Sequence, residues 1–219
     1  MKAIRFGAMA LVVLALLAAA ACHGFFVSES TTQSVAVTPK GVILEQGDTY
    51  NLIAKATTVG GTTTDVTATA TWTTSDGTIA TVAAGVVTAQ TLGGSANTAT
   101  ISAESGGVTG TAIVMVSTTA TLPTSLNVTT TGGSTLTISP LTTLQLKATA
   151  SVSGSDTNVT GLVTWSIPNT TYATVSSSGV ITPVAVCGGL LQPTCPTITG
   201  TVTTKTGTAT GTFPIILID

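Results

Sequence analysis

The sequence predicts an all-β protein made of two tandem β-sandwiches behind an N-terminal signal segment. The first observation is composition, because the 219 residues include 51 Thr and 23 Gly and only 6% are charged. Val, Ile and Leu recur throughout, which distinguishes the chain from a disordered sequence of low charge. The second observation is a set of short runs that alternate apolar and polar residues between Gly-rich turns. The third is that the same pattern occurs twice.

The N-terminal segment has the order of features expected of an export signal. Lys2 and Arg5 form a positive region, residues 8–17 form an apolar stretch, and small residues at 18–21 precede Cys22. The apolar stretch is too short for a comfortable membrane span of about 20 residues. We therefore expect residues 1–21 to be a signal peptide that is removed.

The end of this signal, Leu17-Ala-Ala-Ala-Ala-Cys22, resembles a bacterial lipoprotein signal, with Ala19 where Leu is usual. The resemblance implies a diacylglycerol on the Cys22 thiol and a lipid-anchored protein of the bacterial cell envelope, outside the cytoplasm. Two or three acyl chains would hold it firmly, at ~0.8 kcal/mol per buried methylene. The alternative is ordinary cleavage and a secreted protein. Residues 22–34 then form the lipidated Cys and a tether, in which His23 is a solvated linker residue.

Charge and composition exclude several classes of function. Loss of Lys2 and Arg5 leaves four basic side chains against eight acidic ones, a net charge of −4. No basic surface remains to hold phosphates, so we expect no nucleic-acid partner. The only His lies in the tether, so a Ser or Thr nucleophile has no base to activate it, and we expect no enzyme. The carboxylates are scattered singly, which predicts no metal or cofactor and makes a calcium ion between the domains a minor alternative.

The internal repeat becomes visible when Trp72 is aligned with Trp165, an offset of 93 residues. The corresponding offsets elsewhere range from 91 to 94 up to Thr182, as short loop insertions would produce. The repeat predicts a first domain over 35–117, a linker over 118–124 and a second domain over 125–219.

Period-two alternation predicts the strands. In 66–73, Val66, Ala68, Ala70 and Trp72 would share one face, and 144–150 repeats this pattern. Trp72 and Trp165 each end an inward-facing series, so we expect them to be core residues that bury on the order of 200 Å² each. The alternative role is an exposed indole that stacks on carbohydrate.

Around Trp72, the runs Trp72-Thr-Thr-Ser-Asp76, Ile79-Ala-Thr-Val82 and Gly85-Val-Val-Thr88 resemble the bacterial immunoglobulin-like domain, group 2. The second copy departs from this pattern at 167–169 and in its late loop. The resemblance implies immunoglobulin-like sandwiches of the kind found in surface proteins of bacteria and phage. The family has no common catalytic site and its ligands vary, so the resemblance implies a fold more than an activity.

The second copy carries a seven-residue insertion with two cysteines. In an exported chain, Cys187 and Cys195 are expected to form a disulfide, whereas a redox role would favour a two-residue spacer and a zinc site would need two more ligands. Leu190 and Leu191 lie at the tip of the closed loop. They either fold back over the sandwich, which we favour, or form a contact with a partner.

Together these features predict a non-catalytic surface lipoprotein whose two domains form a structural, adhesive or ligand-presenting arm. Two sandwiches in series would project on the order of 70 to 80 Å. The expected partners are the membrane, through the lipid, and a surface protein or polysaccharide. The alternative is a carbohydrate-binding module of the cell envelope, for which Tyr50 and Tyr172 are the available aromatic rings. The sequence leaves open whether the strand at 211–218 pairs within its own domain.

Overall fold

The computed structural model describes residues 29–90, 97–118, 122–131, 137–138, 143–187 and 194–217. The prediction of an all-β fold is confirmed, because the described residues form strands and one short 3-10 helix. The signal segment, Cys22 and the tether up to residue 28 lie outside the described residues. Two hydrophobic cores are present, and we call the parts around them the first and second units.

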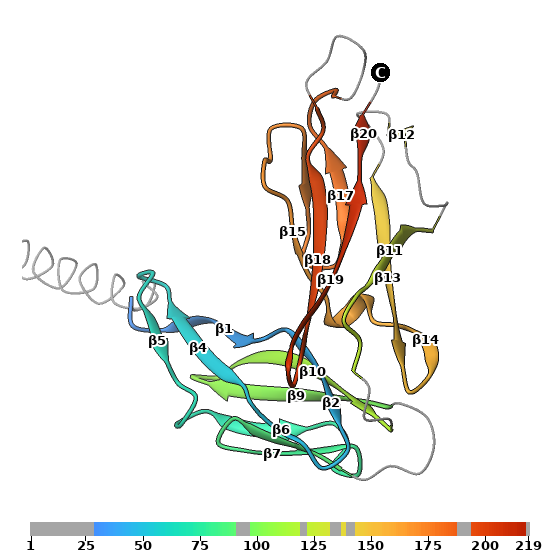
Figure 1. The fold of residues 1–219 in the computed structure, drawn as a ribbon. Helices are drawn as coiled ribbons and strands as arrows, with labels where there is room; N and C mark the ends of the chain where they lie inside the picture. The colour runs from blue at the N-terminus through green and yellow to red at the C-terminus, as the bar shows by residue number, and fades with distance from the viewer. Residues whose placement is uncertain are drawn as a thin grey trace, which may run out of the picture.

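The first unit is a two-layer sandwich around one core (Figure 1). One layer contains β2, β10, β9 and β6, and the other contains the small sheets β1-β4-β5 and β3-β8-β7. Its strands are β1 (Thr32–Thr38), β2 (Gly41–Glu45), β3 (Thr49–Asn51), β4 (Ile53–Thr58), β5 (Thr63–Asp65), β6 (Thr71–Thr74), β7 (Ala80–Ala83), β8 (Val86–Ala89), β9 (Asn97–Ser105) and β10 (Val108–Ser117).

The second unit repeats this arrangement. One layer contains β15, β18 and β19, and the facing layer has the order β11-β13-β17-β16, with β14 paired to β13. Its elements are β11 (Asn127–Thr130), β12 (Thr137–Ile138), β13 (Leu144–Val152), β14 (Ser155–Asn158), η1 (Thr160–Leu162), β15 (Thr164–Ser166), β16 (Ala173–Val175), β17 (Val180–Pro183), β18 (Thr197–Thr204), β19 (Gly207–Pro214) and β20 (Ile216–Leu217).

Matching hydrogen bonds show that the two units are structural copies. The backbone N–H of Leu52 donates to Gly85 O at 2.8 Å, and the N–H of Leu146 donates to Gly179 O at 2.9 Å. Both glycines have a φ of 83°, a left-handed conformation that favours Gly. The spacing of these pairs agrees with the repeat found in the sequence.

The segment before Trp72 differs from the prediction. Residues 66–70 form a turn, in which the N–H groups of Thr69 and Ala70 donate to Val66 O, so the predicted strand over 66–73 is wrong for 66–70 and holds for 71–73, in β6. The cause is local hydrogen bonding: Thr67 Oγ1 accepts from the N–H of Ala54 at 2.9 Å, and the Thr67 N–H donates to Asp65 Oδ1 at 2.8 Å. Such side-chain bonds compete with a strand ladder.

One continuous sheet joins the two units. It has the order β15-β18-β2-β10-β9-β6, with β19 also paired to β18, and the link is a parallel pairing of Thr203 and Thr204 with Val42 and Ile43. Since neighbouring residues of a strand face opposite sides of a sheet, β2 serves two cores. Val42 and Leu44 are buried in the first core, and Ile43 is buried in the second.

The adjacent strand β10 is shared in the same way. Ala112, Val114 and Val116 belong to the first core, whereas Met115 is buried in the second. The sheet is therefore covered by the rest of the first unit on one side and by the rest of the second unit on the other.

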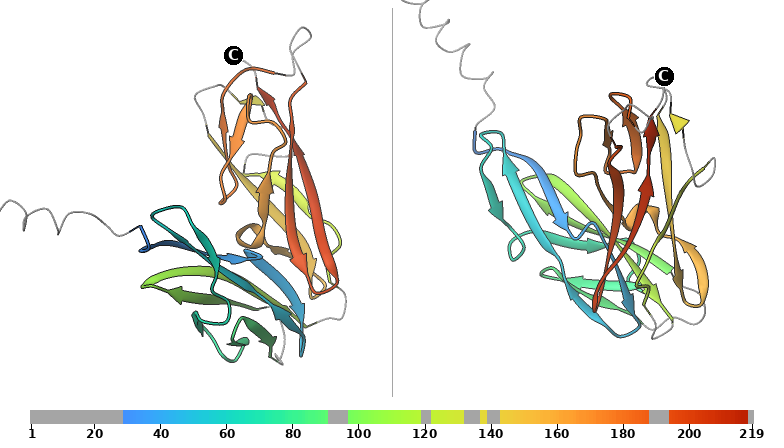
Figure 2. Two further views of the ribbon diagram at one scale, coloured as in Figure 1. Left: turned by 90° about the vertical axis from the view of Figure 1, so that its left-hand side faces the viewer. Right: turned by 45° about the horizontal axis from the view of Figure 1, so that its top comes forward.

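Figures 1 and 2 show that the second unit stands across the first and does not continue its long axis. The expectation of two sandwiches arranged in series is therefore wrong, and the reach estimated from it is too long. The predicted linker is also engaged where it is described: the Thr118 N–H donates to Ser153 Oγ at 2.9 Å, and Leu122 is buried in the second core.

The last strands pair within the second unit. All eight residues of β19 pair with β18, and β20 pairs in parallel with β12. The pairing of Thr137 with Ile216 matches that of Ile43 with Met115 in the first unit. Hence β12 and β20 are the repeat equivalents of β2 and the end of β10.

Candidate functional site

The two cysteines of the late insertion form a disulfide, as predicted. Cys187 and Cys195 are joined with a Cα–Cα distance of 5.1 Å, and Cys187 is fully buried in the second core. The bond therefore ties the loop to the core. Leu190 and Leu191 lie outside the described residues, as does Cys22.

Trp72 packs at the margin of the first core and is partly buried. Its Nε1–H donates to Thr67 O at 2.8 Å, a carbonyl of the turn that replaces the expected strand. The prediction of a core role thus holds for its packing, while its burial is less complete than the alternation suggested.

Trp165 is only 8% exposed and belongs to the second core. Its Nε1–H has no hydrogen-bond partner in the described structure. The carbonyl equivalent to that of Thr67 is Thr160 O, which accepts from the Val163 N–H at 3.3 Å as η1 closes. In the second unit this carbonyl therefore accepts from the backbone N–H at the end of η1, whereas in the first unit the equivalent carbonyl accepts from the indole of Trp72.

The two tyrosines give little support to carbohydrate stacking. Tyr50 is half-buried against the first core, and Tyr172 is half-buried against the second. Stacking of a sugar requires an open ring face, and the packed side of each ring is already covered by protein.

A face of aligned hydroxyl groups covers the outer side of β15, β18 and β19. Cross-strand pairing sets Thr199 opposite Thr212, Thr201 opposite Thr210, and Thr203 opposite Thr208. On the other edge of β18, β15 adds Ser166 beside Thr199 and Thr164 beside Thr201. We call these eight residues the hydroxyl face: Thr164, Ser166, Thr199, Thr201, Thr203, Thr208, Thr210 and Thr212.

The hydroxyl face is open to solvent and carries no charge. Its residues are exposed or half-buried, and they alternate with the buried Ile198, Val202 and Ala209. Within the described residues, none of the six Thr side chains that β18 and β19 contribute to the hydroxyl face makes a hydrogen bond. Each hydroxyl can both donate and accept, so the face offers a regular set of free donors and acceptors.

A pocket of about 400 Å³ lies at the foot of this face, where the two units meet. It is lined by Thr49, Tyr50 and Asn51 of β3 and by Lys205 of the β18–β19 turn. Lys205 Nζ donates to Thr49 O at 2.6 Å and lies 3.7 Å from Asp48 Oδ1. The ammonium group is thus neutralised locally, and it covers an outward-facing carbonyl of the edge strand β3.

The first unit has an equivalent face with a different character. Its matching rows are Thr73–Ser102–Thr111 and Thr71–Glu104–Thr109, so a carboxylate stands where the second unit has Thr201. At the end of this face, Ile113 and Met115 are covered by the second unit. Among the described residues, therefore, only the second unit has a long neutral face.

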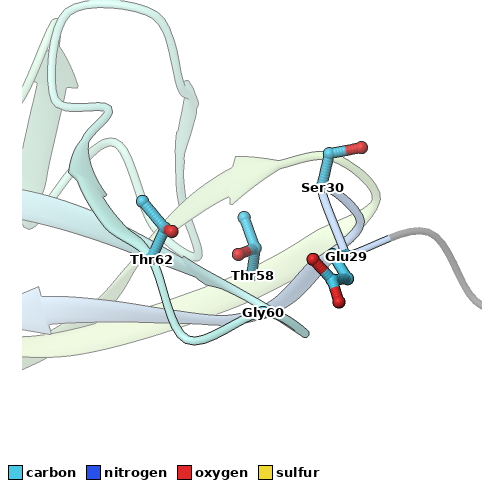
Figure 3. Close-up of a pocket in the computed structure, with 5 residues that line it drawn as sticks. All are labelled: Glu29, Ser30, Thr58, Gly60 and Thr62. Carbon is cyan, nitrogen blue, oxygen red and sulfur yellow. The ribbon is translucent and has the colours of Figure 1, made fainter.

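A second pocket, of about 330 Å³, lies where the described chain begins (Figure 3). Glu29 and Ser30 line one side of it, and Thr58, Gly60 and Thr62 of the β4–β5 turn line the other. The Gly60 N–H donates to Glu29 O at 3.0 Å. The pocket is lined by one acidic side chain and no aromatic ring, which gives it few specific groups for a ligand.

Hydrogen bonds in turns and burial set the pKa shifts of three groups. Bonds from the side chain and backbone of Thr67 lower the pKa of Asp65, and bonds from Thr78 lower the pKa of Asp76. Partial burial lowers the pKa of Lys40, whose Nζ donates to Ser177 O of the second unit. None of these groups lies on the hydroxyl face.

The described part of the chain contains no group of three or more His, Cys, Asp or Glu residues placed to hold a metal ion. In the same ranges, no helix has the length and apolar character needed to cross a membrane.

No family model matches the chain. It is 34% identical over 160 residues to Ice-binding protein 1 of Shewanella frigidimarina (strain NCIMB 400), a match that covers 72% of this chain and 18% of that protein. The chain therefore spans less than a fifth of this curated relative.

Two solved structures give weak likenesses. The S-layer protein rSbsC(31-844) is 22% identical, with 85% of this chain and 28% of that chain covered and a TM-score of 0.33. Human Protocadherin-24 EC1-2 is 11% identical, with 86% and 99% covered and a TM-score of 0.30.

The hydroxyl face was not identified in the sequence analysis. The signal was present in β18, where Thr occupies every second position from 197 to 203. The pocket at the junction could not be found in this way, because it depends on how the two units dock.

Proposed function

We propose that this protein is a non-catalytic arm of the bacterial cell envelope, anchored by lipid on Cys22, that presents a surface of its immunoglobulin-like units to an external ligand. The observation that carries the proposal is the continuous sheet that fixes the second unit on the first. A fixed junction is what a presenting arm needs, because the exposed surface of the second unit then keeps its orientation to the first unit, which follows the tether.

Two further observations support this role. The disulfide between Cys187 and Cys195 is typical of a protein exported to an oxidising compartment. The match to Ice-binding protein 1 covers 18% of that protein, a share that fits a spacer or presenting part of a larger one. The alternative function, a carbohydrate-binding module of the envelope, would rely on hydrogen bonds from the hydroxyl face, since Tyr50 and Tyr172 are packed against the cores.

Membrane fractionation tests the anchor. We expect the wild-type chain in the membrane fraction and the Cys22→Ser variant in the soluble fraction, with unchanged tryptophan emission. Cys195→Ser is the matched control, because it also replaces one cysteine by serine but leaves the proposed lipid site intact, and it should stay with the membrane. A wild-type chain found in the soluble fraction would refute the anchored arm.

A further inference from the structure

The hydroxyl face ends beside the junction pocket, because Lys205 of the pocket directly follows β18. The parallel pairing places Thr203 on the same side of the continuous sheet as Val42, whose side chain lies in the first core. The outer side of β18 therefore faces the side on which the first unit rises from the sheet. The β3 edge with Thr49 and Asn51 forms the floor at one end of the face, beside Lys205.

The chemistry of this surface favours a neutral ligand rich in hydroxyl groups. Along β18, facing Thr side chains repeat every second residue, about 6.8 Å apart, and their partners across the strand pair are about 5 Å away. The face offers no cationic group for an anion, because Lys205, at its foot, is paired with Asp48. Nor does it offer an apolar pocket of the kind that holds a peptide side chain.

Strand addition by a peptide is disfavoured on β19. One edge of β19 pairs with β18, and at its other edge the Leu126 N–H donates to Thr210 O at 2.9 Å. A peptide that added a strand to this edge, the usual source of affinity in β-augmentation, would have to displace Leu126.

We propose that the hydroxyl face of the second unit, together with the junction pocket, binds a neutral polysaccharide chain that lies along β18 and β19. The sugar hydroxyls exchange hydrogen bonds with the paired Thr rows, and one end of the chain reaches Asn51 and Lys205. This inference deepens the proposed function, because it names the ligand class and the surface that the arm presents.

The test compares two matched double variants of the full mature chain. Thr201→Val with Thr210→Val removes the central hydroxyls of the second unit, and Thr73→Val with Thr111→Val makes the same change on the equivalent face of the first. Val keeps the shape and the strand preference of Thr, so both variants should fold, which tryptophan emission checks. Binding is measured by affinity electrophoresis in gels that contain hydroxyethyl cellulose, xylan or glucomannan, and by pull-down on cellulose and chitin.

We expect at least one neutral polysaccharide to bind, the second-unit variant to bind at least tenfold more weakly, and the first-unit variant to bind like wild type. Equal loss in both variants, or no effect in either, overturns the proposal. So does a failure of the wild-type chain to bind any of these polysaccharides.

Two further arms separate the ligand classes. Binding to isolated cell envelopes should be lost after periodate oxidation of sugar diols and kept after protease digestion, and the reverse result assigns a protein partner. Retention of the wild-type chain in slowly grown ice, with loss on Thr201→Val and Thr210→Val, assigns ice to this surface and overturns the polysaccharide. None of these assays needs the lipid, so their failure is distinguishable from failure of the membrane fractionation.

Discussion

Replacing Ile43 by Ala should destabilise the second unit, although Ile43 lies in a strand of the first. Its side chain is 0% exposed and belongs to the second core, while the neighbouring Val42 belongs to the first. Ile→Ala removes three buried carbons, about 2.4 kcal/mol at ~0.8 kcal/mol per methylene. The cavity left behind raises the expected cost to about 3 to 4 kcal/mol.

Each unit contains one Trp, so the two cores can be followed separately. In a Trp165→Phe background the emission of Trp72 reports on the first core, and in a Trp72→Phe background Trp165 reports on the second. With a urea dependence of about 2 kcal/mol per molar, Ile43→Ala should lower the Trp165 midpoint by roughly 1.5 to 2 M. Val42→Ala is the control, and it should act mainly on the Trp72 midpoint.

The result that would refute this reasoning is a shift of the Trp72 midpoint alone on Ile43→Ala, or no shift of either. Either outcome would mean that β2 does not contribute side chains to two cores.

Three other predictions follow from contacts in the two units. Asp65→Asn should slightly lower stability at neutral pH and flatten the loss of stability in acid. The lowered pKa of Asp65 gives a contribution that is present above the ordinary carboxyl pKa and disappears as pH falls through the folded-state value, and Asn lacks it at every pH. Urea midpoints between pH 2 and 7 measure the effect, and an unchanged acid profile would contradict it. After allowance for the area that each side chain buries, Trp165→Phe should lower the free energy of unfolding by about 1 kcal/mol less than Trp72→Phe, because only Trp72 loses a hydrogen bond. Thermal melts of the two variants give the order, and the opposite order would contradict the hydrogen-bond assignment. Cys195→Ser should lower the free energy of unfolding by about 2.5 kcal/mol, because the disulfide no longer closes a loop of nine residues, and it should leave Cys187 as a buried thiol. A chemical-denaturation midpoint equal to that of the wild-type chain would exclude this contribution.

Much of the fold could be predicted from the sequence because the signals were local. Alternation in 144–150 gave a strand that the structure contains as part of β13. The repeat aligns Gly85 with Gly179, and in the structure the carbonyls of both glycines accept matching hydrogen bonds. The pairing of Cys187 with Cys195 followed from export and spacing.

The failures arose where side chains or tertiary contacts compete with alternation. Residues 66–70 read as a strand, but Thr67 bonds to Ala54 and turns the chain. The sequence of 41–45 does not indicate that its side chains pack in two different cores, because any fully buried strand is apolar on both faces. The junction pocket depends on that same docking, so it was also beyond sequence reasoning.

Because β2 and β10 contribute side chains to both cores, the chain cannot be divided into two independent fragments. A fragment that ended after Ser117 would bring Ile43, Ile113 and Met115 into contact with water on one side of its sheet. A fragment that began after residue 118 would lose Ile43 and Met115 from its own interior. Neither half should fold stably when expressed alone, and the first half should be prone to aggregate. The two copies therefore act as one folding unit, in which a substitution at Ile43, Ile113 or Met115 of the first copy also affects the core of the second.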